Sequence, residues 1–160
     1  MTLPISQATL VNFLIDAKRH TYAAQGDEAS VPALLTGSRQ LEFQDGPLLS
    51  RDIYFGSAYF VGQETVYHAE SPLWAMGYAG GLLSPTASAA EAGQVYGFLR
   101  AALRRGEPHR LYRGPNVYRE GACTYTDESH GELAAFWGVE TITHADKPVY
   151  ELRYHGGRLR

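Results

Sequence analysis

The 160-residue sequence has a single cysteine, Cys123, so no disulfide can form within the chain. Structural disulfides belong to oxidising compartments, and their exclusion favours a cytoplasmic location. The six histidines are scattered without the close pairing of zinc ligands, so we expect no metal site. No stretch approaches the ~20 apolar residues of a membrane-spanning helix, and we therefore expect no membrane association.

The sequence also lacks a basic excess. Its formal net charge is −3, which argues against direct binding of nucleic acid by the surface as a whole. Arginines do gather in one segment, and we interpret this cluster as the solvated end of a helix; its members are Arg100, Arg104, Arg105, Arg110 and Arg113. The glycine-rich segment at 77–81 lacks the lysine of a phosphate-binding loop and no helix follows it directly, so we expect no cofactor.

What is present is ordinary globular composition, with 44% hydrophobic and 19% charged residues. A chain of this length predicts one domain over residues 1–160. No internal repeat or low-complexity segment is evident. The eleven tyrosines are unusual, and tyrosine suits half-buried sheet faces and pocket walls because its ring packs while its hydroxyl seeks a partner.

Two helices are predicted by apolar residues at three- and four-residue spacing. The first follows Ser6 and ends near Tyr22, and the second runs from Ser88 to Arg105, with both serines as N-caps. Residues 25–38 contain two glycines and a proline, which predicts a long loop. Its segment VPALL is a candidate lid over a site.

Seven extended segments are predicted, at 39–44, 48–55, 58–68, 73–83, 116–126, 133–144 and 148–155. Short connections between successive strands indicate antiparallel pairing. Runs of strands separated by single helices favour an α+β fold. We therefore expect a bent, half-barrel-like antiparallel sheet with two helices, in the order helix, four strands, helix, three strands.

The segment PLWAMGYAGG (72–81) places large side chains at Trp74, Met76 and Tyr78 on one face of its strand. Only small residues lie between them, which predicts that the helices approach the small-residue face. The bulky face would then line a concave hollow.

Several segments resemble the bacterial domain of unknown function 5680 family. They are FLIDAKRHTYA (13–23), the long stretch 48–81, FLRAAL (98–103), YRGP (112–115) and VYELRYHGG (149–157). Some members follow a repressor-type helix-turn-helix, which implies a sensory or accessory role, although this sequence leaves no room for that module. The resemblance implies a fold and a context but assigns no residue a role.

Three residues are candidates for acid–base chemistry. Asp52 lies on one strand, and Glu64 on its neighbour would form a carboxylate pair with perturbed acidity. His155 would carry a proton in the terminal segment ELRYHGG. The competing interpretations place Asp52 and Glu64 on solvated strand faces, and His155 in an exposed ladder of opposite charges along the terminal segment.

Five residues are candidates for binding a ligand: Tyr54, Trp74, Tyr78, Arg113 and Tyr118. The arginine would present a planar fork to a carboxylate or phosphate, or else tie down its own loop. Aromatic walls with a few polar groups are typical of a ligand pocket, and we favour a small-molecule binding or sensing domain. The alternatives are a hydrolase or isomerase, so the sequence does not decide whether the chain is an enzyme, and an interaction module that forms a homodimer.

Overall fold

Each of the two helices begins at a serine whose side chain caps it. The computed structural model describes residues 4–23, 29–106 and 113–160. In helix α1 (Gln7–His20), Ser6 accepts a hydrogen bond from the Thr9 amide at 3.0 Å. In helix α2 (Ala89–Leu103), Ser88 and Glu91 bond each other's backbone amides in a capping box. Both predicted helices are confirmed.

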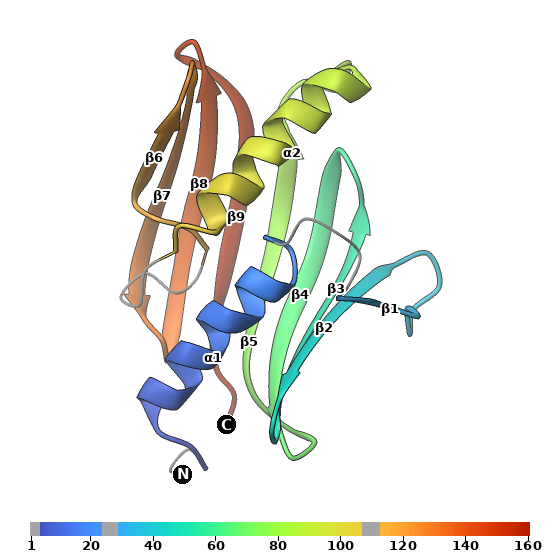
Figure 1. The fold of residues 1–160 in the computed structure, drawn as a ribbon, viewed down its shortest axis with the longest axis vertical. Coiled ribbons are helices and arrows are strands. Elements are labelled where there is room, and N and C mark those ends of the chain that lie inside the picture. The colour runs from blue at the N-terminus through green and yellow to red at the C-terminus, as the bar shows by residue number, and fades with distance from the viewer. Residues whose placement is uncertain (1–3, 24–28, 107–112) are drawn as a thin grey trace.

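The strands form one open antiparallel sheet, which confirms the α+β class. Its order is β1-β2-β3-β4-β5-β9-β8-β7-β6. The strands are β1 (Ser30–Val31), β2 (Arg39–Asp45), β3 (Leu48–Gly56), β4 (Tyr59–His68), β5 (Ser71–Leu82), β6 (Val117–Glu120), β7 (Cys123–Glu132), β8 (Ala135–His144) and β9 (Lys147–Arg158). The helices lie together on one face of this sheet, across the place where β5 meets β9 (Figure 1).

The expected count of seven strands is wrong, because the structure has nine. The segment predicted as one strand at 116–126 reverses at Gly121, whose φ of 58° suits a tight turn, and so becomes β6 and β7. The predicted loop at 25–38 contains the short edge strand β1, while its residues 25–28 lie outside the described part. The order is therefore helix, five strands, helix, four strands.

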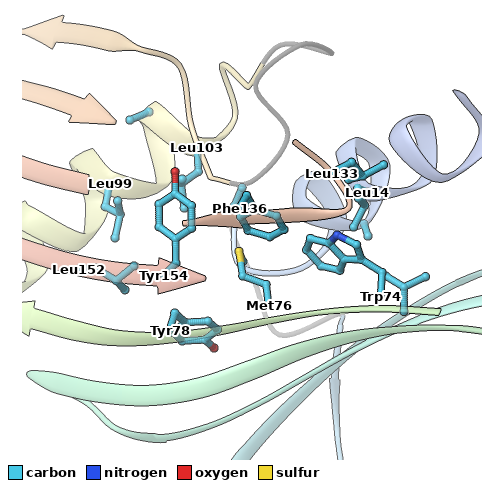
Figure 2. Packing of buried hydrophobic residues seen from close by; sticks show 14 of the residues in the cluster. Leu14, Trp74, Met76, Tyr78, Leu99, Leu103, Leu133, Phe136, Leu152 and Tyr154 are labelled. Carbon is cyan, nitrogen blue, oxygen red and sulfur yellow. The ribbon is translucent and has the colours of Figure 1, made fainter. Parts of the chain in front are cut away.

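The prediction that the helices cover the small-residue face of the sheet is also wrong. The core joins Trp74 and Met76 of β5 to Leu14 of α1 and Leu99 of α2, so the helices pack on the bulky face. Figure 2 shows these side chains on one side of the sheet. Packing two apolar surfaces together removes more apolar area from water than packing a helix on alanine and glycine. The opposite face, with Ala75, stays partly exposed.

The fold is an internal duplication, contrary to the expectation of no repeat. Helix α1 with β2–β5 and helix α2 with β6–β9 are two copies of one helix and four antiparallel strands. Segments 68–81 and 144–157 share residues at matching positions, namely His68 and His144, Ala69 and Ala145, Pro72 and Pro148, Tyr78 and Tyr154, Gly80 and Gly156, and Gly81 and Gly157. In both copies the two residues of the hairpin turn, Ala-Glu and Ala-Asp, have positive φ.

A pseudo-twofold axis relates the copies and passes between β5 and β9. Tyr78 pairs with its own counterpart, Tyr154, while Met76 pairs with Gly156 and Leu152 with Gly80 in the reciprocal positions. Each helix begins over the strands of the other half and ends over those of its own (Figure 1). The axis therefore generates two equivalent places between a helix and the sheet.

Candidate functional site

A cavity of about 450 Å³ lies between the N-terminal half of α2 and strands β3, β4 and β5. Its aromatic wall consists of Tyr22, Tyr54, Phe60, Tyr78 and Tyr96. Four charged side chains also line it, namely Arg39, Asp52, Arg100 and Arg113. The N-terminal part of α2 lines the cavity with the small residues Ala89, Ala92 and Gly93, and Tyr96 and Arg100 follow them along the helix. The cavity thus combines aromatic surface with a few polar groups, as ligand pockets do.

Asp52 and Tyr78 form a buried polar pair in the cavity wall. The Tyr78 hydroxyl donates to Asp52 Oδ1 at 2.6 Å. The tyrosine can reach across β4 because its strand partner there is Gly62, where an added Cβ would collide with the Tyr78 ring. Burial, reinforced by the neighbouring Glu64 carboxylate, raises the pKa of Asp52 to about 6. Asp52 can therefore donate or accept a proton near neutral pH.

Arg113 reaches the cavity as part of a buried ion pair. Its Nε and Nη2 atoms donate to the two Glu140 carboxylate oxygens at 3.1 and 2.7 Å. The hydroxyls of Tyr125 and Tyr150 also donate to Glu140, at 2.8 and 2.7 Å. Burial raises the pKa of Glu140, but the charge of Arg113 and the hydrogen bonds from Arg113, Tyr150 and Tyr125 outweigh it. The pKa therefore lies below its usual value. The Arg113 guanidinium lies 5.6 Å from the centre of the Tyr78 ring.

The second half of the sheet repeats this polar arrangement. The Tyr154 hydroxyl donates to Asp127 Oδ1 at 2.7 Å across Gly138, just as Tyr78 reaches Asp52 across Gly62. The counterpart of Glu140 is Glu64, which accepts a hydrogen bond from the Ser50 hydroxyl at 3.1 Å. The aspartate–tyrosine pair and the buried glutamate are thus common to both halves, whereas the glutamates differ in their partners, which are Arg113 for Glu140 and Ser50 for Glu64.

The space beside the second pair is filled with side chains. Trp74 is fully buried and stacks on Phe136, with ring centres 5.5 Å apart. Leu14 of α1 and Leu133 lie beside this pair in Figure 2. Aligned from the serine caps, Leu10 of α1, also fully buried, corresponds to Ala92 of α2. One of the two equivalent places is therefore packed, while the other is hollow.

An adjoining groove of about 990 Å³ continues from the cavity toward β1 and β2. The two share Tyr22, Arg39, Tyr54 and Arg100. Arg104 lines the groove and donates to the Ala23 carbonyl at 2.7 Å. The candidate lid contributes Val31 and Ala33 to the groove, while its Leu34 and Leu35 are exposed.

The structure brings together four of the predicted site residues. Tyr54, Tyr78 and Arg113, which we expected to bind a ligand, line the cavity with the candidate acid Asp52. Glu64 lies directly across the strand pair from Asp52 but is not among the cavity-lining residues.

The other candidates lie elsewhere. Trp74 belongs to the core and does not line the cavity. Tyr118 stacks on Phe98 at the far edge of the sheet. His155 is exposed and pairs with Gly77, whose side of the sheet is opposite to that of Tyr78, so His155 cannot act together with Asp52.

Five of the aromatic and charged cavity residues escaped sequence analysis: Tyr22, Arg39, Phe60, Tyr96 and Arg100. The signals were weak but present. Arg100 belongs to the arginine cluster interpreted as a solvated helix end, of which Arg110 lies outside the described residues. Gly93 and Gly97 interrupt an otherwise good helical segment, and an added Cβ at either position would meet no atom within 4 Å. Since no packing contact requires these glycines, they indicate open space beside the helix.

Within the described residues, no three histidine, cysteine, aspartate or glutamate side chains are grouped to hold a metal ion. None of the described helices has both the length and the apolar character needed to cross a bilayer.

Residues 52–159, more than half of the chain, match the family described as Domain of unknown function (DUF5680). The matched segment begins at Asp52 and includes Tyr78, Arg113 and Glu140, whereas α1 precedes it. No match was found among curated proteins or among solved structures. The sequence pattern and this match agree, and the chain belongs to the DUF5680 family.

Proposed function

We propose that this chain is a small-molecule-binding domain whose ligand occupies the cavity between α2 and strands β3–β5. The observation that carries the proposal is the difference between the two pseudo-equivalent places. One is closed by Trp74, Leu10 and Leu14, whereas the other holds about 450 Å³ beside the same kind of aspartate–tyrosine pair.

The small residues of α2 support this proposal because they are costly for the fold alone. Glycine in a helix interior costs about 1 kcal/mol relative to alanine. At Ala92, a leucine like Leu10 of the other helix would gain stability by filling the hollow. Space preserved at a cost in stability is what a binding site requires. A binding domain also agrees with the sensory or accessory role implied by the resemblance.

The wall chemistry favours an organic ligand with a flat apolar part. Tyr54, Phe60, Tyr78 and Tyr96 offer ring faces and edges, and Asp52 accepts a hydrogen bond at one place in the wall. The Tyr96 hydroxyl is anchored on the Ala58 carbonyl at 2.8 Å, which fixes the ring over the cavity. Rigid aromatic walls reduce the entropy lost on binding.

A thermal-shift screen of metabolites against three proteins tests the proposal. Wild type and Gln94→Leu, altered at an exposed position of the same helix, should be stabilised by the same compounds. Ala92→Leu should melt at or above the wild-type temperature and lose the response to those compounds. If Ala92→Leu responds as wild type does, or if no compound stabilises wild type, the ligand does not occupy this cavity.

Acid–base catalysis in the same cavity is a second candidate, favoured by the pKa of about 6 at Asp52. Tyr78 holds this carboxyl in a fixed position on the cavity wall. A hydrolase or isomerase activity found by substrate screening should disappear in Asp52→Asn while ligand binding persists. An activity unchanged in Asp52→Asn would remove the carboxyl from the reaction.

A further inference from the structure

Taking the proposed binding function as its basis, we infer that the ligand is a small organic acid. Its anionic group, a carboxylate or phosphate, is bound by Arg39 and Arg100 where the cavity opens into the adjoining groove. The apolar part of the ligand then lies inward, between α2 and the rings of β3–β5.

Arg39 and Arg100 lie where the cavity meets the groove. Arg39 begins β2 and pairs with Tyr54 of β3, while Arg100 lies in the C-terminal half of α2. Both line the cavity and both line the groove, so they stand at the junction of the two spaces. Two guanidinium groups from opposite walls can bind one carboxylate or phosphate with several charge-assisted hydrogen bonds.

The arginines that line the cavity and the groove differ in whether their charge is paired. Arg113 is neutralised by Glu140, and Arg104 is held by the Ala23 carbonyl. Neither Arg39 nor Arg100 makes an ion pair with any residue in the described part of the chain. Among the described lining residues, Asp52 is the sole carboxylate. Within the described residues, the junction therefore carries positive charge that a bound anion would balance.

The surface of α2 beside the cavity and the groove is formed partly by glycine. Gly93 lines the cavity, Gly97 lines the groove, and Arg100 follows one turn later on the same side of α2. An added Cβ at either glycine would meet nothing within 4 Å. The helix thus leaves its surface bare on the approach to Arg100, which gives a ligand room to reach the guanidinium.

Three probes of matched shape test the charge requirement: phenylacetate, phenyl phosphate and the neutral phenylacetamide. Binding is measured from the amide NMR signals of Gly93 and Gly97 during titration of the full chain. We expect the two acids to shift both signals in wild type and the amide to bind at least about tenfold more weakly, as expected for loss of a charged hydrogen bond. The relative affinity of the two acids identifies the anionic group.

The variants Arg39→Gln and Arg100→Gln should each weaken binding of the acids about tenfold or more and leave the weak binding of the amide unchanged. Arg153→Gln, at an exposed position on the outer face, is the matched control and should bind as wild type. Equal affinity for acids and amide, with both signals shifted, would overturn the inference and leave the proposed function standing. Absence of any shift at Gly93 and Gly97 with all three probes would overturn both.

Discussion

Tyr78 and Tyr154 lie directly opposite each other across the β5–β9 pair, and each donates its hydroxyl hydrogen bond away from the partner, to an aspartate in its own half of the sheet. The two bonds differ by 0.1 Å, at 2.6 and 2.7 Å. The similarity of these bonds means that the difference between the halves lies in what covers them. Predictions about stability and binding can therefore be separated by position.

The helix glycines should be replaceable with a gain in stability. Gly93→Ala and Gly97→Ala should each raise the free energy of unfolding by about 1 kcal/mol, because alanine has the higher helix propensity and no neighbour obstructs its Cβ. Urea unfolding measures this change. Gly62→Ala provides the contrast and should be destabilising, since its Cβ would collide with the Tyr78 ring. A lower midpoint for Gly93→Ala would contradict the open space beside α2.

Asp52 should make stability depend on pH. Its pKa rises from 3.8 to about 6 on folding, so the folded state binds the proton more tightly than the unfolded state. The stabilisation is complete below pH 4 and is lost as the pH rises through 6, by on the order of 3 kcal/mol. Urea unfolding of wild type and Asp52→Asn between pH 4 and 7 should show the variant gaining stability relative to wild type as the pH rises. Parallel curves would show that Asp52 titrates normally.

Removing only one partner of the ion pair between Arg113 and Glu140 should strongly reduce the free energy of unfolding. Glu140 has no exposed surface and the Arg113 residue is 6% exposed, so Arg113→Met would leave a buried carboxylate without its cation. We expect a loss of about 3–5 kcal/mol in the free energy of unfolding. Adding Glu140→Gln should restore much of it, because it removes the unpaired charge and leaves an amide whose oxygen can accept from one of Tyr125 and Tyr150 while its nitrogen donates to the other. Additive losses in the double variant would show that the pair is not coupled.

Substitution of Trp74 should lower the free energy of unfolding without changing the affinity for a ligand. Trp74→Phe should lower the free energy of unfolding by removing part of the stacked surface on Phe136, and Trp74→Ala by about 3–5 kcal/mol. Compounds that stabilise wild type should bind folded Trp74→Phe with unchanged affinity in calorimetry. A large loss of affinity would return Trp74 to the cavity wall, where the sequence had suggested it.

Most elements of the fold could be predicted from the sequence, since caps and periodicity are local signals. Ser6 and Ser88 mark both helix starts, and Asp45-Gly46 marks the turn between β2 and β3. The face of the sheet that the helices cover could not be predicted. The alternation of large and small residues in β5 distinguishes two faces but does not indicate which one is covered. The repeat escaped notice because its run of identical residues is short, and the other identities, such as Gly62 with Gly138 and Glu64 with Glu140, are scattered along the preceding strand.

The candidate site was predictable in part. Tyr54, Tyr78, Arg113 and Asp52 were found through their residue types and segments. Arg39 and Arg100 come from separate elements, and their meeting depends on how α2 crosses the sheet. Trp74 was misplaced because a large aromatic residue suits a pocket wall and a core equally well.

The pseudo-twofold arrangement of the fold allows its two halves to serve different purposes. The half in which Leu10, Leu14 and Trp74 fill the space stabilises the fold. Substitutions there should be tolerated only when they preserve the packing. The half beside Ala92 and Gly93 leaves open space, so under the proposed binding function its residues are free to change with the ligand. The proposed function therefore predicts that relatives of this chain vary most around α2 and least beneath α1.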